Sequence, residues 1–154
     1  MTTMVDSKKD KLNIPEIITQ AVYNTPVEGV PAYAAILSIV KEGSMPRTEV
    51  KQYGNTVFIT HFSEDKDLAV GRALNIDTAK NFIINGEEYF RELVLGGTKK
   101  FVAQFDQKSF ATAFMAFKRK PITTEMKMWI VDTPKGNTQV RISLAGELIE
   151  RRNK

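Results

Sequence analysis

The chain has 154 residues, of which 42% are hydrophobic and 26% are charged, and its formal net charge is +4. This composition is typical of a globular domain and argues against a disordered chain, a collagen or a coiled coil. The absence of cysteine excludes disulfides, thiolate metal sites and thiol nucleophiles, and the single histidine excludes any site built from two histidines. No apolar run is long enough to cross a membrane, and the polar opening does not resemble a secretory signal, so we expect a cytoplasmic protein.

The N-terminal part predicts a polar arm at residues 1–12 and then a single domain at residues 13–146. Asn13 and Pro15 are typical of a helix start, and apolar residues recur with helical spacing as far as Tyr23. After a loop, Pro31 opens a second predicted helix that runs to Lys41. Its expected core-facing stripe consists of Tyr33, Ile36, Leu37 and Val40.

From residue 48 onward the apolar residues alternate, which predicts strands over residues 48–53, 56–62 and 68–74. The first two are joined by Gly54-Asn55, a favoured two-residue hairpin turn. In the second strand, Val57, Ile59 and His61 are expected to face one side of the sheet, and Phe58, Thr60 and Phe62 the other.

The C-terminal part predicts a long helix over residues 78–95, capped by Asn75 or Asp77. Gly86 lies in the apolar stripe of this helix, which suggests close contact with a sheet. A strand, a helix and a closing hairpin follow at residues 100–105, 107–118, 125–131 and 138–144, and residues 147–154 form a polar basic tail. We therefore expect an α+β fold with a mixed, mostly antiparallel sheet and helices packed on it.

The element order is helix, helix, three strands, helix, strand, helix and two strands, over about residues 14–144. This order resembles that of the GNAT superfamily of acyl-CoA-dependent N-acetyltransferases. The segment LAVGRALNIDTAKNFIINGEEYF corresponds in position to the family's fourth strand and cofactor-binding helix, and KKFVAQFDQKSFATAFMAFKRKP to its fifth strand and fourth helix. If the chain were an acyltransferase, the resemblance would imply acetyl-CoA as the cofactor, with Asn75, Thr78 and Lys80 as the residues that bind it; otherwise we expect no cofactor.

The start of the long helix departs from the family pattern. The family has a Gln or Arg followed by a glycine-spaced turn, whose N–H groups hold the pyrophosphate of coenzyme A. Residues 75–80 contain no glycine, and Asp77 would place a negative charge where a phosphate should lie, although Lys80 partly offsets it. The chain is therefore similar to acetyltransferase-like domains that have lost their motifs, as occur in small phage proteins used in virion assembly.

We find no catalytic or metal-binding constellation in the sequence. His61 is most simply interpreted as a histidine satisfied by a neighbour, and its alternative role is that of a general base. We therefore expect a non-catalytic assembly or interaction protein, such as a phage virion or host-interaction component, with protein partners or self-assembly and no membrane contact. The alternatives are an acyl-CoA-dependent N-acyltransferase and a nucleic-acid-binding protein.

Short basic clusters are the expected contact residues for nucleic acid or an acidic protein. They comprise Lys99, Lys100, Lys118, Arg119, Lys120, Arg151 and Arg152. The nearby aromatic series is predicted to be core rather than a base-stacking surface, and its members are Phe101, Phe105, Phe110, Phe114 and Phe117. Trp129 is predicted to be a core or interface residue that could anchor a partner.

Overall fold

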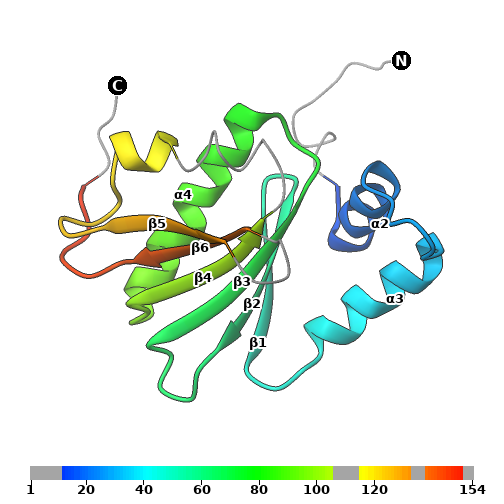
Figure 1. The fold of residues 1–154 in the computed structure, drawn as a ribbon, viewed down its shortest axis with the longest axis horizontal. Coiled ribbons are helices and arrows are strands. Elements are labelled where there is room, and N and C mark those ends of the chain that lie inside the picture. The colour runs from blue at the N-terminus through cyan, green and yellow to red at the C-terminus, as the bar shows by residue number, and fades with distance from the viewer. Residues whose placement is uncertain (1–11, 106–114, 133–137, 151–154) are drawn as a thin grey trace.

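The structure, a computed structural model, describes residues 12–105, 115–132 and 138–150. Figure 1 shows a twisted sheet with α4 along one face and with α2 and α3 beside β1, β2 and β3. The elements are α2 (Ile14–Asn24), α3 (Ala32–Gly43), β1 (Thr48–Tyr53), β2 (Thr56–Phe62), β3 (Leu68–Asn75), α4 (Ala79–Leu95), β4 (Lys100–Phe105), β5 (Lys127–Asp132) and β6 (Thr138–Ser143). Residues 115–119 are also helical.

The sheet has the strand order β1-β2-β3-β4-β6-β5. β3 and β4 pair in parallel, and the other four pairings are antiparallel. The predicted α+β fold with a mixed, mostly antiparallel sheet is thereby confirmed. The parallel pair arises because α4 carries the chain from one end of β3 back to the start of β4.

The start of α2 follows directly from its sequence. The side chain of Asn13 accepts a hydrogen bond from the N–H of Glu16, whose carboxylate accepts one from the N–H of Asn13 in return, and Pro15 lies in the first turn. The inner face of α2 packs against β2 and β3, which forms one of two apolar cores. Its buried members are Ile17, Ile18, Ala21, Val22, Ile39, Val57, Ile59 and Leu74.

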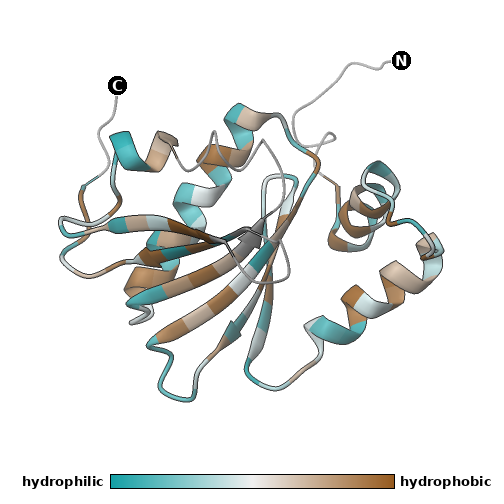
Figure 2. Cartoon of the chain, in the orientation of Figure 1, coloured by the Kyte–Doolittle hydropathy of each residue, from teal (hydrophilic) through white to brown (hydrophobic). Residues whose placement is uncertain are grey.

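The predicted core stripe of α3 is wrong in three of its four positions. Tyr33, Leu37 and Val40 are 69%, 64% and 55% exposed. The helix instead turns a face of smaller residues inward, with Ile39 buried and Ala32, Ala35 and Ile36 partly buried against the α2 core. Alanine allows a helix backbone to approach its neighbour closely, whereas the prediction followed the largest apolar side chains. Figure 2 shows hydrophobic residues along much of α3.

The second core lies between the sheet and α4 and is rich in aromatic rings. Phe58 of β2 stacks on Tyr89 of α4 with ring centroids 4.0 Å apart, and Phe90 meets Phe101 and Phe117 edge to face. Both faces predicted for β2 are therefore correct. Phe101 and Phe117 are core residues as predicted, whereas the side chain of Phe105, and Phe110 and Phe114, lie outside the described residues.

Two predictions about α4 are wrong. Its N-cap is Thr78, whose side chain accepts from the N–H of Asn81; neither Asn75 nor Asp77 caps the helix. Gly86 does not approach the sheet: a Cβ placed there would lie 3.4 Å from the ring of Phe117, in the helical segment 115–119. The absence of a side chain at Gly86 thus brings two helices together on the same side of the sheet.

The structure describes residues 147–150 of the predicted C-terminal tail but only residue 12 of the predicted N-terminal arm. Residues 147–150 of the predicted tail run beside residues 122–124, where the N–H of Ile149 donates to the carbonyl of Ile122. Residues 1–11 of the predicted arm, and Arg151 and Arg152, lie outside the described residues. Within the described ranges, no helix is long and apolar enough to span a membrane.

Candidate functional site

The two parallel strands separate partway along their length. β3 pairs with β4 only from Leu68↔Lys100 to Gly71↔Ala103. Beyond that point β3 continues to pair with β2 as far as Asn75, and β4 continues to pair with β6. The facing backbone edges of β3 and β4 are therefore unpaired with each other after Gly71, and we call this opening the splay. Unpaired strand edges offer N–H and C=O groups to a ligand that carries amides.

The N-terminus of α4 lies three residues beyond the end of β3, at the wide end of the splay. The N–H groups of its first turn have no intrahelical acceptor and carry the positive end of the helix dipole. Thr78 uses its side chain as the cap, and Lys80 is exposed in the first turn. This region therefore presents N–H groups and a cation to solvent.

The carboxylate of Asp77 is occupied by hydrogen bonds to the β1–β2 turn and to α4. Its Oδ2 accepts hydrogen bonds from the backbone N–H of Asn55, in the β1–β2 turn, and from the side-chain amide of Asn85, both at 2.9 Å. Asn85 is buried and also donates to the hydroxyl of Thr56 at 2.9 Å. The acidic residue therefore joins the loop to the hairpin and to α4, and its carboxylate is stabilised by two hydrogen-bond donors.

Asn75 belongs to the same network. Its Oδ1 accepts from the hydroxyl of Thr56 and from the N–H of Asp77, and its Nδ2 donates to the carbonyl of Asp77. Of the three predicted cofactor-binding residues, the structure thus gives Asn75 and Thr78 structural hydrogen bonds and leaves the Lys80 side chain exposed at the helix start.

His61 lies on β2 within a set of paired polar groups next to the splay. Its Nε2 is 2.9 Å from Oε2 of Glu42, and its Nδ1 is 2.8 Å from the hydroxyl of Thr48. The other oxygen of Glu42 accepts from Arg72 at 3.1 Å, and Arg72 is the first residue of β3 beyond the β4 pairing. The histidine therefore has neighbours on both ring nitrogens and forms an acid–base pair with Glu42.

The side of the sheet away from α4 is covered by α2 at the end of β3, but over the start of β3 and over β4, β6 and β5 no helix of the described ranges lies on it (Figure 1). We call this surface the open sheet face. Its outward side chains, given by the strand registers, are Leu68, Val70, Arg72, Lys100, Val102, Lys127, Trp129, Val131, Gln139, Arg141 and Ser143. Trp129 is 46% exposed and Val70 is 43% exposed, so Trp129 is not a core residue.

The predicted basic clusters lie in different layers. Lys100 projects from the open sheet face, and Lys99 is exposed just before β4. Lys118, Arg119 and Lys120 are exposed at the end of the helical segment whose Phe117 packs against α4, on the other side of the sheet. The structure therefore does not bring Lys100 and the 118–120 cluster together on one surface.

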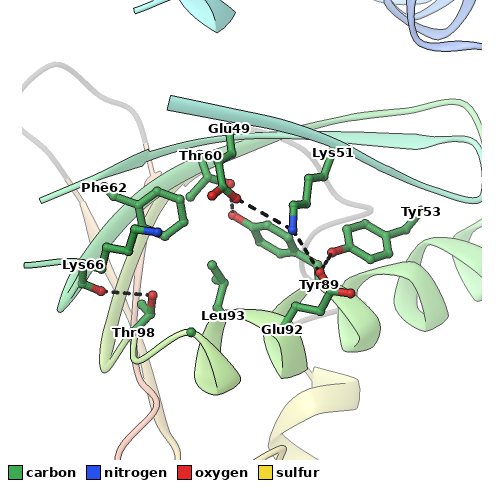
Figure 3. A pocket seen from close by; sticks show the side chains of 11 residues that line it. Glu49, Lys51, Tyr53, Thr60, Phe62, Lys66, Tyr89, Glu92, Leu93 and Thr98 are labelled. Carbon is green, nitrogen blue, oxygen red and sulfur yellow. Dashed lines mark hydrogen bonds and ion pairs between the residues drawn. The ribbon is translucent and has the colours of Figure 1, made fainter. Parts of the chain in front are cut away.

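A small pocket of about 120 Å³ lies between β1 and the C-terminal half of α4, on the face opposite the open sheet face. Figure 3 shows the hydroxyl of Tyr53 and the ammonium of Lys51 pointing toward Glu92, at 2.5 and 3.3 Å. Burial and the bond to Glu92 raise the pKa of Tyr53, and the same bond lowers the pKa of Glu92. The polar groups of Tyr53, Lys51 and Glu92 are hydrogen-bonded to one another, and the pocket lies away from the splay. The described residues contain no cluster of potential metal ligands.

Sequence reasoning missed Glu42, Arg72 and Arg141, although it singled out Trp129 as a core or interface residue. Glu42 and Arg72 meet across 30 residues of chain, and Arg141 and Trp129 lie opposite each other in the β5–β6 hairpin. Residue alternation predicts which way each side chain points along its own strand. The register that makes them neighbours depends on how the strands pair, which residue alternation does not specify.

No protein-family model matches the chain, and a comparison with curated proteins finds no similar sequence. Among solved structures, an aminoglycoside N-acetyltransferase superposes with a TM-score of 0.51 at 8% identity, covering 92% of this chain and 94% of that one. A ribosomal-protein-alanine N-acetyltransferase from Escherichia coli has a TM-score of 0.48 at 11% identity, covering 94% of this chain and 96% of that one.

These comparisons correct the main functional prediction. The preferred interpretation as a non-catalytic assembly or interaction protein is contradicted, because the fold that the chain shares over nearly its full length is that of an N-acetyltransferase. The alternative prediction fits the findings better. At this level of identity the likeness concerns the fold alone. The chain has the fold of the GNAT acetyltransferases.

Proposed function

We propose that the chain is an acyl-CoA-dependent N-acyltransferase. The observation that carries the proposal is the splay, because it combines an unpaired strand edge with a helix N-terminus at its wide end. When bound, acyl-CoA supplies an activated thioester carbonyl, two amides in its pantetheine arm and a pyrophosphate. The remaining argument concerns the residues of this chain.

From Arg72 to Asn75, the edge of β3 that faces β4 has backbone groups that are not paired with β4. These groups can hydrogen-bond the amides of the pantetheine arm. Backbone N–H and C=O groups at a strand edge bind amides as an added strand would. The first-turn N–H groups of α4 and the ammonium of Lys80 suit a pyrophosphate at the wide end. Because Asp77 is held by Asn55 and Asn85, the loop fits the cofactor better than its composition suggests.

Glu42 and His61 are the residues that we assign to proton transfer. An amine must lose a proton as it is acylated, and a carboxylate–imidazole pair can accept it directly or through one water. Arg72 holds one oxygen of Glu42 and places the pair next to the narrow end of the splay. His61 shares the other oxygen of Glu42, so a proton taken up by either group stays within the pair.

Turnover is the direct test of this function. The purified chain is incubated with acetyl-CoA and a panel of primary amines that includes peptides, amino acids, polyamines and aminoglycosides, and both free thiol and acetylated amine are measured. We expect thiol release that requires an amine and matches product formation one to one. Thiol release that does not depend on any amine, or none at all together with no acetyl-CoA binding, would overturn the proposal.

A further inference from the structure

The strand registers arrange the open sheet face in rows. One row crosses β2, β3, β4, β6 and β5 and consists of His61, Val70, Val102, Arg141 and Trp129. It is the last outward-facing row in which β3 and β4 still pair, so it borders the splay. The preceding row brings Lys100, Ser143 and Lys127 into line on β4, β6 and β5.

Among the described side chains that the strands present on this surface, all the charged ones are cationic. None of the outward side chains described on β3, β4, β5 and β6 is an Asp or Glu. Arg72 is paired with Glu42, but Lys100, Lys127 and Arg141 have no carboxylate of the described residues within ion-pair distance. The surface therefore has positive charge that is not neutralised locally.

Arg141 is the best placed of these cations. Its Nε donates to Gln139 at 2.9 Å, which fixes the side chain, and its terminal nitrogens have no partner among the described residues. A guanidinium in this state can bind a carboxylate through two parallel hydrogen bonds. Trp129 lies directly across from it in the hairpin and offers an apolar surface beside the charge.

We propose, on the basis of the proposed acyltransferase function, that the acyl acceptor is an acidic peptide whose free amine reaches the splay while a carboxylate binds Arg141. Strands lie about 4.8 Å apart, so the middle of the splay and β6 are separated by about 7 Å. An extended peptide advances about 3.4 Å per residue, so the acidic side chain belongs two or three residues from the amine. Lys100 and Lys127 then attract further acidic residues of the peptide, and Trp129 packs against an apolar residue of the peptide.

The same surface suits nucleic acid less well. Binding of a single strand requires a groove of cations that follows the backbone and successive aromatic side chains for the bases. Here one aromatic residue, Trp129, lies in a row whose central members are the valines Val70 and Val102. A mixture of apolar and cationic groups matches an acidic peptide more closely.

The test uses Trp129 as its own reporter, because it is the single tryptophan of the chain. Tryptophan emission is followed while three peptides with free N-terminal amines are added: one with Glu at positions two and three, its Gln counterpart and its Lys counterpart. We expect the Glu peptide to bind at least tenfold more tightly than the Gln peptide. Arg141→Gln should reduce this ratio to below threefold, whereas Lys118→Gln, an equal change of charge in the other layer, should not.

Equal binding of the Glu and Gln peptides, tighter binding of the Lys peptide, or no saturable change in emission would overturn the inference. Tighter binding of an oligothymidylate than of the Glu peptide would also overturn it, in favour of nucleic acid. Because emission needs no acetyl-CoA, these outcomes are independent of turnover. Acetylation of amines with no preference for acidic peptides would leave the proposed function standing and refute this inference alone.

Discussion

At the scale of single residues, Glu42 occupies the most informative position in the molecule. It lies at the end of α3, yet its two oxygens join Arg72 on β3 and His61 on β2. Its side chain is 23% exposed, so the pair is accessible to a substrate but partly shielded from water. A carboxylate whose only role was to hold two strands to a helix would tolerate replacement by an amide.

Replacement of Glu42 by Gln separates the two roles. Gln keeps the shape and one acceptor oxygen but cannot take up a proton. We expect kcat to fall about 100-fold, as is typical when general base catalysis is lost, while the dissociation constant for acetyl-CoA and the midpoint of urea unfolding change little. The rate of thiol release at saturating substrate, in a stopped or coupled assay, measures kcat. A variant with undiminished kcat would assign Glu42 a purely structural role.

Tyr53, Lys51 and Glu92 give a residue-scale prediction about pH and stability. The hydrogen bond from Tyr53, reinforced by Lys51, lowers the pKa of Glu92 below its ordinary value of 4.5. A lowered pKa in the folded state contributes stability above the unfolded value, and this contribution is lost as the pH falls through the folded value. Because Glu92 is an exposed residue, the contribution at pH 7 is below about 1 kcal/mol.

We therefore expect Glu92→Gln to lower the free energy of unfolding slightly at pH 7 and not at all near pH 2. Urea unfolding at both pH values measures the difference. Glu125→Gln, at an exposed carboxylate outside this cluster, is the control and should have no effect at either pH. A deficit for Glu92→Gln that persisted unchanged in acid would show that the ionic form of Glu92 is not the source.

At the scale of elements, the start of α4 depends on a polar network that joins three segments. Asn85, one and a half turns into the helix, binds both Thr56 at the start of β2 and Asp77 in the loop. Gly54 makes room for it, since a Cβ at that position would lie 2.8 Å from the Asn85 side chain. The network therefore fixes the helix start relative to β3.

Asn85→Ala should lower the free energy of unfolding by about 1 to 3 kcal/mol, because it leaves buried polar groups without partners. It should also weaken acetyl-CoA binding, since Asp77 loses one of the two donors that stabilise its carboxylate. Asn81→Ala, on the exposed side of the same helix, should change stability by less than about 0.5 kcal/mol. Similar effects of the two substitutions would argue against the network.

The elements themselves were largely predictable from sequence, because they depend on local patterns. Alternation placed β1 to β3, and Asn13 and Pro15 placed the start of α2. The failures involve contacts between segments distant in sequence. Asn75 and Asp77 are residue types that often cap helices, but here their side chains accept hydrogen bonds from Thr56 and Asn85. The inner face of α3 includes two alanines rather than the largest apolar residues of the helix.

At the scale of the whole molecule, the site lies where several strands meet, and this limited what the sequence could reveal. The fold class followed from the element order. The functional prediction failed because it judged the helix start by the glycines it lacks and by the charge of Asp77. The structure shows that this carboxylate is hydrogen-bonded by two donors and that the strand edges of the splay are unpaired, which composition alone does not indicate.

Calorimetric titration with acetyl-CoA tests the central claim most directly, when carried out on the native chain, Lys80→Glu and Lys99→Glu. A glutamate in the first turn of α4 is compatible with the helix dipole, so Lys80→Glu should remain folded while opposing a bound pyrophosphate. Lys99 lies beside the paired end of β3 and β4 and receives the same change of charge. We predict saturable binding to the native chain, about tenfold weaker binding to Lys80→Glu and unchanged binding to Lys99→Glu. No binding at millimolar acetyl-CoA, or equal weakening by both substitutions, would contradict an acyl-CoA site in the splay.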